Sequence, residues 1–112
     1  MTKSLQPELA TLADPIRREI LDMLRVAPRN AGEIAAQFPV TWPAISRHLR
    51  LLKQARLIEE RRTQRHRTYA LRREALLPVL AWLSALARDP SGALPVPAPD
   101  PVRPIVGRQD FS

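Results

Sequence analysis

The segment TWPAISRHLRLLK, residues 41–53, has a polar face made almost entirely of cationic and hydroxyl side chains. If the segment is a helix, Ile45, Leu49 and Leu52 fall within an arc of about 60°. The opposite side carries Ser46, Arg47, Arg50, Lys53 and, just beyond the segment, Gln54. Exposed helices usually mix both signs of charge, because opposite charges four residues apart stabilise each other. This segment has no carboxylate, so we expect its polar face to bind anions that the chain itself does not supply.

The net charge of +7 is concentrated around the same segment. Residues 47–73 contain ten basic side chains and only two acidic ones, Glu59 and Glu60, which gives +8. The rest of residues 1–88 sums to zero, and residues 89–112 carry −1. One basic region on a neutral domain is expected of a protein that binds a polyanion. The alternative is a solvated basic face that serves only solubility.

No set of side chains suited to catalysis or metal binding can be assembled from the sequence. The chain has no cysteine, which excludes disulfides and thiolate metal sites. Ser46 and His48 lie about 200° apart around a helix and cannot form a dyad. His48 and His66 are two possible ligands on different elements, with no third. We therefore expect no catalytic residue, no metal and no cofactor.

Helix-capping patterns divide the first half of the chain into short helices. Residues 5–12 form the first, with Leu5, Leu9 and Leu12 on one face. Asp14-Pro15 starts a second helix that ends near Pro28. Its inward residues are Ile16, Ile20, Met23 and Leu24.

A third helix, over residues 31–38, opens on a capping box formed by Asn30 and Glu33. Its inward residues are Ile34, Ala35 and Phe38. Thr41 then caps the cationic helix, so two short helices follow each other at helix-turn-helix spacing.

The period changes after Leu57. Alternation in LIEERRTQRHRTYAL predicts a β-hairpin whose cationic tip is Thr63–His66. Residues 73–88 form a last helix, with Pro78 near its first turn. This helix is apolar on more than one face, so it needs two surfaces to bury against, and we expect a homodimer.

Residues 1–88 form one domain, and residues 89–112 form a tail that holds half of the 12 prolines. The tail has no periodic pattern, and we expect it to be disordered, with polyproline II character. The chain shows neither a signal-peptide pattern nor an apolar run of membrane-spanning length, so a cytoplasmic protein with no membrane partner is expected.

Residues 12–83 resemble the ArsR family of bacterial winged helix-turn-helix transcription regulators. The matching stretches are LADPIRREILDMLR, RNAGEIAAQF and TWPAISRHLRLLKQARLIEERR. The resemblance implies a mainly α fold with a small β-hairpin, dimerising through its first and last helices, and a DNA-binding repressor. Metal-sensing members carry cysteines on the helix before the turn, or Asp and His clusters on the last helix. This chain has neither, which implies a member that responds to a protein, to another ligand or to nothing.

Two turns depart from the family pattern. The turn after the recognition helix usually reads Ala-Gly-Leu, whereas this chain has Ala55-Arg56-Leu57. If residue 56 is left-handed, arginine costs about 1 kcal/mol relative to glycine there. The tip of the hairpin also lacks the expected glycine.

The resemblance places the recognition helix, residues 42–54, in the major groove and the wing, residues 61–68, at the adjacent minor groove. Ser46, Arg47 and Arg50 would then read base edges. Phosphate or sugar contacts would come from Thr41, Trp42, His48 and Lys53, and wing contacts from Arg61, Arg62, Arg65, His66 and Arg67. The predicted dimer residues are Leu5, Leu9, Leu12, Leu76, Leu80, Leu83 and Leu86. A two-fold dimer predicts an inverted-repeat operator in double-stranded DNA.

Two interpretations from different classes remain. The first is a homodimeric, sequence-specific repressor of transcription, and one version of this hypothesis is that it represses its own promoter. No inducer is identified. The second is a winged-helix interaction module whose basic face binds a protein or RNA. A protein-binding winged helix has no need for outward Arg47 and Arg50. RNA binding would call for exposed aromatics, and the chain has only two Trp, one Tyr and two Phe.

Overall fold

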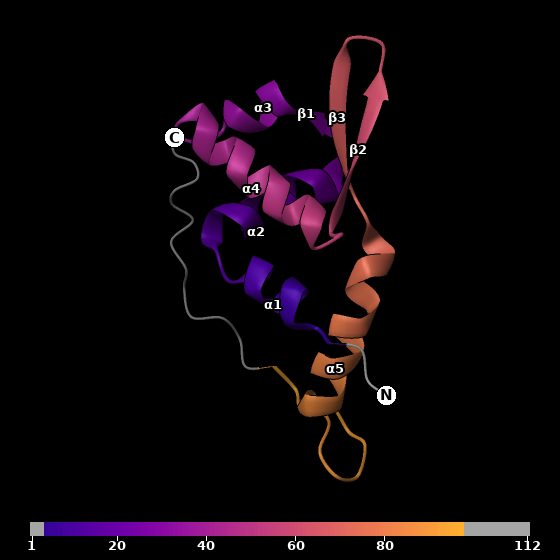
Figure 1. The fold of residues 1–112 in the computed structure, drawn as a ribbon. Coiled ribbons are helices and arrows are strands. Elements are labelled where there is room, and N and C mark those ends of the chain that lie inside the picture. The colour runs from indigo at the N-terminus through magenta and orange to yellow at the C-terminus, as the bar shows by residue number, and fades with distance from the viewer. Residues whose placement is uncertain (1–3, 98–112) are drawn as a thin grey trace.

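A computed structural model of the chain describes residues 4–97. These residues form helices and a small antiparallel sheet that lies at one side of them (Figure 1). The elements are α1 (Gln6–Leu12), α2 (Pro15–Val26), β1 (Arg29–Asn30), α3 (Ala31–Ala35), α4 (Trp42–Gln54), β2 (Ile58–Thr63), β3 (His66–Leu71), the 3₁₀ helix η1 (Arg73–Leu76) and α5 (Leu77–Ala87). In Figure 1 the β2–β3 hairpin projects from one end of the helices and α5 extends from the other. This is the mainly α fold with a β-hairpin that the sequence predicts.

The predicted helix starts are confirmed by their caps. The carboxylate of Asp14 accepts hydrogen bonds from two backbone N–H groups of α2, at 2.9 and 3.0 Å. Asn30 and Glu33 form the reciprocal capping box, at 2.8 and 2.9 Å. Thr41 accepts from a backbone N–H in the first turn of α4, at 3.3 Å. Each cap satisfies donors that have no partner inside the helix, so local sequence fixes where α2, α3 and α4 begin.

One apolar core fixes the orientation of α4. Its most buried members are Ile20, Leu24, Ile34, Ile45, Leu49, Leu52, Leu57 and Ile58. Partly buried residues that pack around them include Ile16, Met23, Ala35 and Phe38. The three predicted inward residues of α4 are 0%, 3% and 0% exposed, so the apolar arc faces α2, α3 and the hairpin. The polar face of α4 therefore points away from the core.

The sheet contains a strand that the sequence pattern does not predict. Its order is β1-β3-β2, and both pairings are antiparallel. β1 has only two residues, too few for any alternation, and it forms because the outer edge of β3 offers backbone partners. The hairpin tip is tighter than the expected four residues, since Thr63 pairs with His66 and leaves Gln64 and Arg65 as the turn.

Two helices differ from their predicted extents. α3 ends at Ala35 rather than at residue 38, and the N–H groups of Gln37 and Phe38 bond three residues back, as in a 3₁₀ turn. Pro39 follows, and proline disfavours helical geometry in the residue before it. The predicted helix over 73–88 is divided into η1 and α5, and Pro78 is the second residue of α5, where its missing N–H costs nothing.

In the turn after α4, residue 56 has the left-handed backbone conformation for which the family pattern carries glycine. Arg56 has a φ of +62°. Its N–H bonds to the carbonyl of Lys53 at 2.9 Å, and the N–H of Leu57 bonds to that of Leu52 at 3.1 Å. This is the Schellman arrangement, in which glycine is preferred at the left-handed position. Because of this turn, Leu57 is fully buried at the start of the hairpin.

Arg56→Gly is expected to raise the free energy of unfolding by about 1 kcal/mol, because glycine has no Cβ to strain at this φ. Urea denaturation monitored by circular dichroism measures the change. Ala55→Gly is the matched control. Ala55 has ordinary helical angles and is buried, so glycine there is expected to lower stability. Equal effects of the two variants would contradict the assignment of strain to Arg56.

The part of the tail that the structure describes begins with a short turn. The carboxylate of Asp89 accepts from the backbone N–H groups of Ser91 and Ala93, at 2.9 and 3.1 Å. Disorder is predicted over residues 89–112, of which 98–112 lie outside the described residues. Among residues 4–97, no helix is long and apolar enough to cross a membrane.

Candidate nucleic-acid interface

The exposed face of α4 carries two arginines that have no acidic partner in the part of the chain that the structure describes. Arg47 and Arg50 are exposed, and neither forms an ion pair or a side-chain hydrogen bond with another residue in 4–97. Ser46 lies beside them and is also exposed. At the start of the helix, Trp42 is 53% exposed. The first half of α4 therefore presents cations and a hydroxyl to solvent, as the sequence predicts.

The second half of α4 differs from the prediction, because the chain does supply a carboxylate there. Glu60 of β2 accepts from Nζ of Lys53 at 2.6 Å and lies 3.2 Å from Nε of Arg67. Two of the predicted DNA contacts are thus paired with one glutamate, which lies between the recognition helix and the wing. The hydrogen bond from Lys53 is the main cause that lowers the pKa of Glu60, partly opposed by burial and helped by the charges of Lys53 and Arg67.

The two faces of the wing differ in whether the β2 arginine has an ion-pair partner within residues 4–97. Glu60 and Arg62 lie on one face of β2 and Glu59 and Arg61 on the other, because side chains alternate along a strand. Arg61 is paired with Glu59 at 2.6 Å. Arg62, Arg65 and His66 are exposed and form no ion pair within residues 4–97. Since Glu60 reaches Lys53, the Arg62 face is the one turned toward α4.

His48 lies against α2, apart from the free arginines of α4. Its side chain is 16% exposed. Nη1 of Arg17 donates to Nδ1 of His48 at 3.2 Å, and Oδ2 of Asp14 is 3.9 Å from the same nitrogen. Arg17 also donates to the carbonyl of Thr11 at 2.8 Å. This contact connects the recognition helix to the start of α2 and the end of α1, and no sequence spacing indicates it.

The same cluster stabilises the ionised form of the Asp14 carboxylate. Burial by itself raises the pKa of Asp14, but the backbone N–H of Arg17 and the nearby His48 and Arg17 side chains outweigh burial. The pKa of Asp14 is therefore held below its ordinary value of 3.8. The cap is ionised wherever the domain is used near neutral pH.

Acid is expected to destabilise the protein through Glu60. A carboxylate whose folded-state pKa is lowered binds fewer protons when folded, so its stabilising effect is present above the unfolded pKa and is lost as pH falls. The loss for Glu60 begins near its ordinary value of 4.5 and is complete below its folded value. Melting temperatures measured between about pH 6 and pH 2 should fall less steeply for Glu60→Gln than for the original chain. Glu19→Gln, at an exposed position of α2, should leave the slope unchanged.

The end opposite the wing is apolar and exposed. On α5 the exposed large side chains are Leu77, Leu80, Trp82, Leu83 and Leu86, each between 44% and 65% exposed. Leu76, predicted with them, instead packs against the core from η1. In α1 the leucines at 5, 9 and 12 are half-buried, and the most buried residues are Glu8 and Thr11. The predicted dimer set does not contain Leu77 and Trp82, which are exposed on α5 together with the predicted Leu80, Leu83 and Leu86.

Comparisons with known proteins agree with this geometry. The model of the bacterial regulatory protein arsR family matches residues 14–60, from the cap of α2 to the start of the wing. The transcriptional repressor SdpR of Bacillus subtilis is 39% identical over 72 residues, which are 64% of this chain and 80% of SdpR. The chain belongs to the ArsR family.

Other relatives of this ArsR-family regulator agree. The HTH-type transcriptional regulator Rv2034 of Mycobacterium tuberculosis is 45% identical over 54% of this chain and 56% of that protein. A solved ArsR family transcriptional regulator, RHA00566, superposes with a TM-score of 0.70 at 31% identity, over 75% of this chain and 92% of the other. The homodimeric winged helix-turn-helix DNA-binding domain Mb0332 of Mycobacterium bovis superposes with a TM-score of 0.60 at 28% identity, over 72% and 77%. The predicted family and winged helix-turn-helix fold are therefore confirmed.

Proposed function

We propose that this ArsR-family regulator is a homodimeric repressor that binds an inverted-repeat operator and acts in the cytoplasm. The observation that carries the proposal is the pair Arg47 and Arg50, which are exposed on the outward face of α4 and have no acidic partner within residues 4–97. Guanidinium groups bind guanine O6 and N7 bidentately in the major groove. SdpR, with 39% identity, is a transcriptional repressor.

The predicted DNA contacts fall into two groups, according to whether the side chain already has a partner within residues 4–97. Ser46, Arg47 and Arg50 read bases. Thr41 and Trp42, at the start of α4, meet phosphate or sugar. Arg62, Arg65 and His66 of the wing reach the adjacent minor groove or its phosphates without first breaking an ion pair.

Four other predicted contacts have partners inside the chain. When DNA binds, Lys53 and Arg67 leave Glu60 and contact phosphate instead. Arg61 leaves Glu59 in the same way. His48, held between Arg17 and Asp14, positions α4 more than it contacts DNA.

The homodimer is supported by the apolar face of α5. Several large side chains stand together in solvent there, which monomeric proteins rarely tolerate unless the patch has a function. The solved relative Mb0332 is a homodimer. Two copies joined through α5 and α1 set two α4 helices about one turn of DNA apart.

Fluorescence anisotropy tests the proposal, with a labelled duplex from upstream of the coding region and a scrambled duplex of the same composition. Across a salt series, we expect tight binding to the first and weak, steeply salt-dependent binding to the second. Equal binding to both would contradict repression of its own promoter, and a genome-wide selection of bound fragments would then be used to find the operator. No binding to any duplex would favour the interaction module that binds a protein or RNA.

A further inference from the structure

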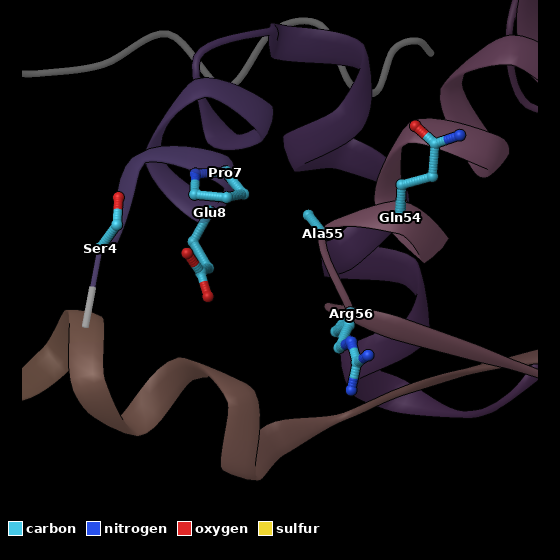
Figure 2. A pocket seen from close by; sticks show the side chains of 6 residues that line it. All are labelled: Ser4, Pro7, Glu8, Gln54, Ala55 and Arg56. Atoms are coloured by element: carbon cyan, nitrogen blue, oxygen red, sulfur yellow. The ribbon is translucent and has the colours of Figure 1, made fainter.

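A cavity of about 250 Å³ lies between α1 and the C-terminal end of α4 (Figure 2). Its lining residues are Ser4, Pro7, Glu8, Gln54, Ala55 and Arg56. This volume is at the small end of the range of ligand pockets, so it suits a small metabolite rather than a peptide. Of its lining residues only Gln54, the last residue of α4, lies on the recognition helix, and the proposed base contacts Ser46, Arg47 and Arg50 do not line it.

The cavity contains a buried carboxylate that the rest of the domain does not satisfy. Glu8 is 7% exposed, and its Oε1 has no hydrogen-bond partner among residues 4–97. A buried acceptor without a partner is costly, and in a native protein it calls for an explanation such as a bound group. Figure 2 shows Glu8 extending from α1 into the cavity. The sequence analysis assigned this residue no role.

The wall formed by the end of α4 carries the opposite charge. Arg56 lines the cavity from the left-handed turn after α4, and it forms no ion pair with Glu8. Figure 2 shows the two side chains coming from different elements on the two sides of the space. The Ser4 hydroxyl and the Gln54 amide add neutral hydrogen-bonding groups. The cavity thus offers one negative and one positive group, separated by neutral polar and apolar surface.

We propose that this cavity binds a small zwitterion of amino-acid size, with its ammonium on Glu8 and its carboxylate on Arg56. An ammonium supplies the donor that Oε1 lacks, and a guanidinium binds a carboxylate bidentately. A bare metal ion fits poorly, because Glu8 is the one carboxylate in the lining and residues 4–97 contain no group of three His, Cys, Asp or Glu side chains that could hold a metal.

Occupancy of the cavity is expected to change DNA binding. A ligand between Glu8 and Arg56 holds α1 against the last turn of α4, and so joins a dimer helix to the recognition helix. This consequence rests on the proposed function, whereas ligand binding itself does not. If the ligand alters affinity for DNA, DNA alters affinity for the ligand by the same factor.

Isothermal titration calorimetry of the full chain without DNA tests the site. The probes are the standard L-amino acids at millimolar concentration, with putrescine and succinate as controls that carry charges of a single sign. We expect at least one amino acid to bind at one per chain and neither control to bind. Glu8→Gln and Arg56→Gly should each weaken binding about tenfold or more. Arg56→Gly relieves the left-handed strain and is expected to stabilise the fold. A loss of ligand binding in this variant therefore cannot be explained by unfolding.

Glu19→Gln is the matched control, since it removes a carboxylate from an exposed position of α2 and should leave binding unchanged. The site is overturned if no amino acid binds, if putrescine or succinate binds as well, or if the two cavity variants bind normally. Anisotropy with and without the bound amino acid then tests regulation. Unchanged affinity for DNA overturns the regulatory role alone, and an amino acid that binds to a protein with no affinity for DNA leaves the site standing and removes the proposed function.

Discussion

Leu83→Glu is expected to make the protein a monomer and to lower its affinity for the operator about 100-fold or more. Leu83 is 49% exposed in the monomer and lies in the middle of the apolar face of α5. Burying one leucine side chain contributes about 1.5–3 kcal/mol, and a buried glutamate without a partner adds a further cost. The loss in DNA binding is large because two linked recognition helices bind far more tightly than one.

Light scattering gives the mass of the particle, and anisotropy gives its affinity for the operator. Val26→Glu is the control, because it adds the same charge at a position 66% exposed at the end of α2. It should leave both the mass and the affinity unchanged. If Leu83→Glu retains the mass of two chains, or if the original chain has the mass of one, dimerisation through α5 is wrong.

Arg47→Ala and Arg50→Ala are each expected to weaken binding to the operator by about 1–3 kcal/mol and to relax its sequence preference. Both side chains are exposed on the outward face of α4 and have no partner in residues 4–97 to which they could return. Their truncation therefore removes contacts with the bases and little else. Affinity for a scrambled duplex should change much less.

Arg65→Ala is expected to behave differently, because Arg65 lies in the tip of the hairpin, where we expect it to contact the backbone of any duplex. It should weaken specific and scrambled duplexes alike and reduce the slope of log affinity against log salt by about 1. Arg25→Ala is the control, since this exposed arginine of α2 has only a 4.0 Å contact with Asp22. Equal losses of specificity from Arg50→Ala and Arg65→Ala would contradict this division between helix and wing.

The sequence alone determined the parts of the protein that depend on residues close together in the chain. The caps Asp14, Asn30 and Thr41 bond to N–H groups two or three residues away, so their effect is visible in any stretch of four letters. The apolar arc of α4 repeats with the period of the helix, and the structure buries it as predicted. The left-handed turn at Arg56 was raised by the resemblance to the family, whose pattern has glycine at this position.

The tertiary structure decided which charges remain free. The polar face of α4 has no carboxylate of its own. Glu60 of β2, seven residues from Lys53 in sequence, nevertheless pairs with Lys53 and also with Arg67 of the neighbouring strand. His48 meets Arg17 across 31 residues of sequence. These pairings depend on the register of β2 with β3 and on the packing of α4 against α2, and no local pattern encodes either.

The tertiary structure also placed Glu8 opposite Arg56. Residue 8 belongs to a short helix whose leucines carry the sequence signal, and residue 56 to a turn recognised only for its backbone. Their side chains line one cavity because α1 lies beside the end of α4 once the chain is folded. Local hydrogen bonds and helical periodicity are set by neighbours in sequence, so the elements could be predicted. Pairing and solvation of charges are set by neighbours in space, so the ion pairs of Glu60 and the unsatisfied Oε1 of Glu8 among residues 4–97 could be identified only in the folded domain.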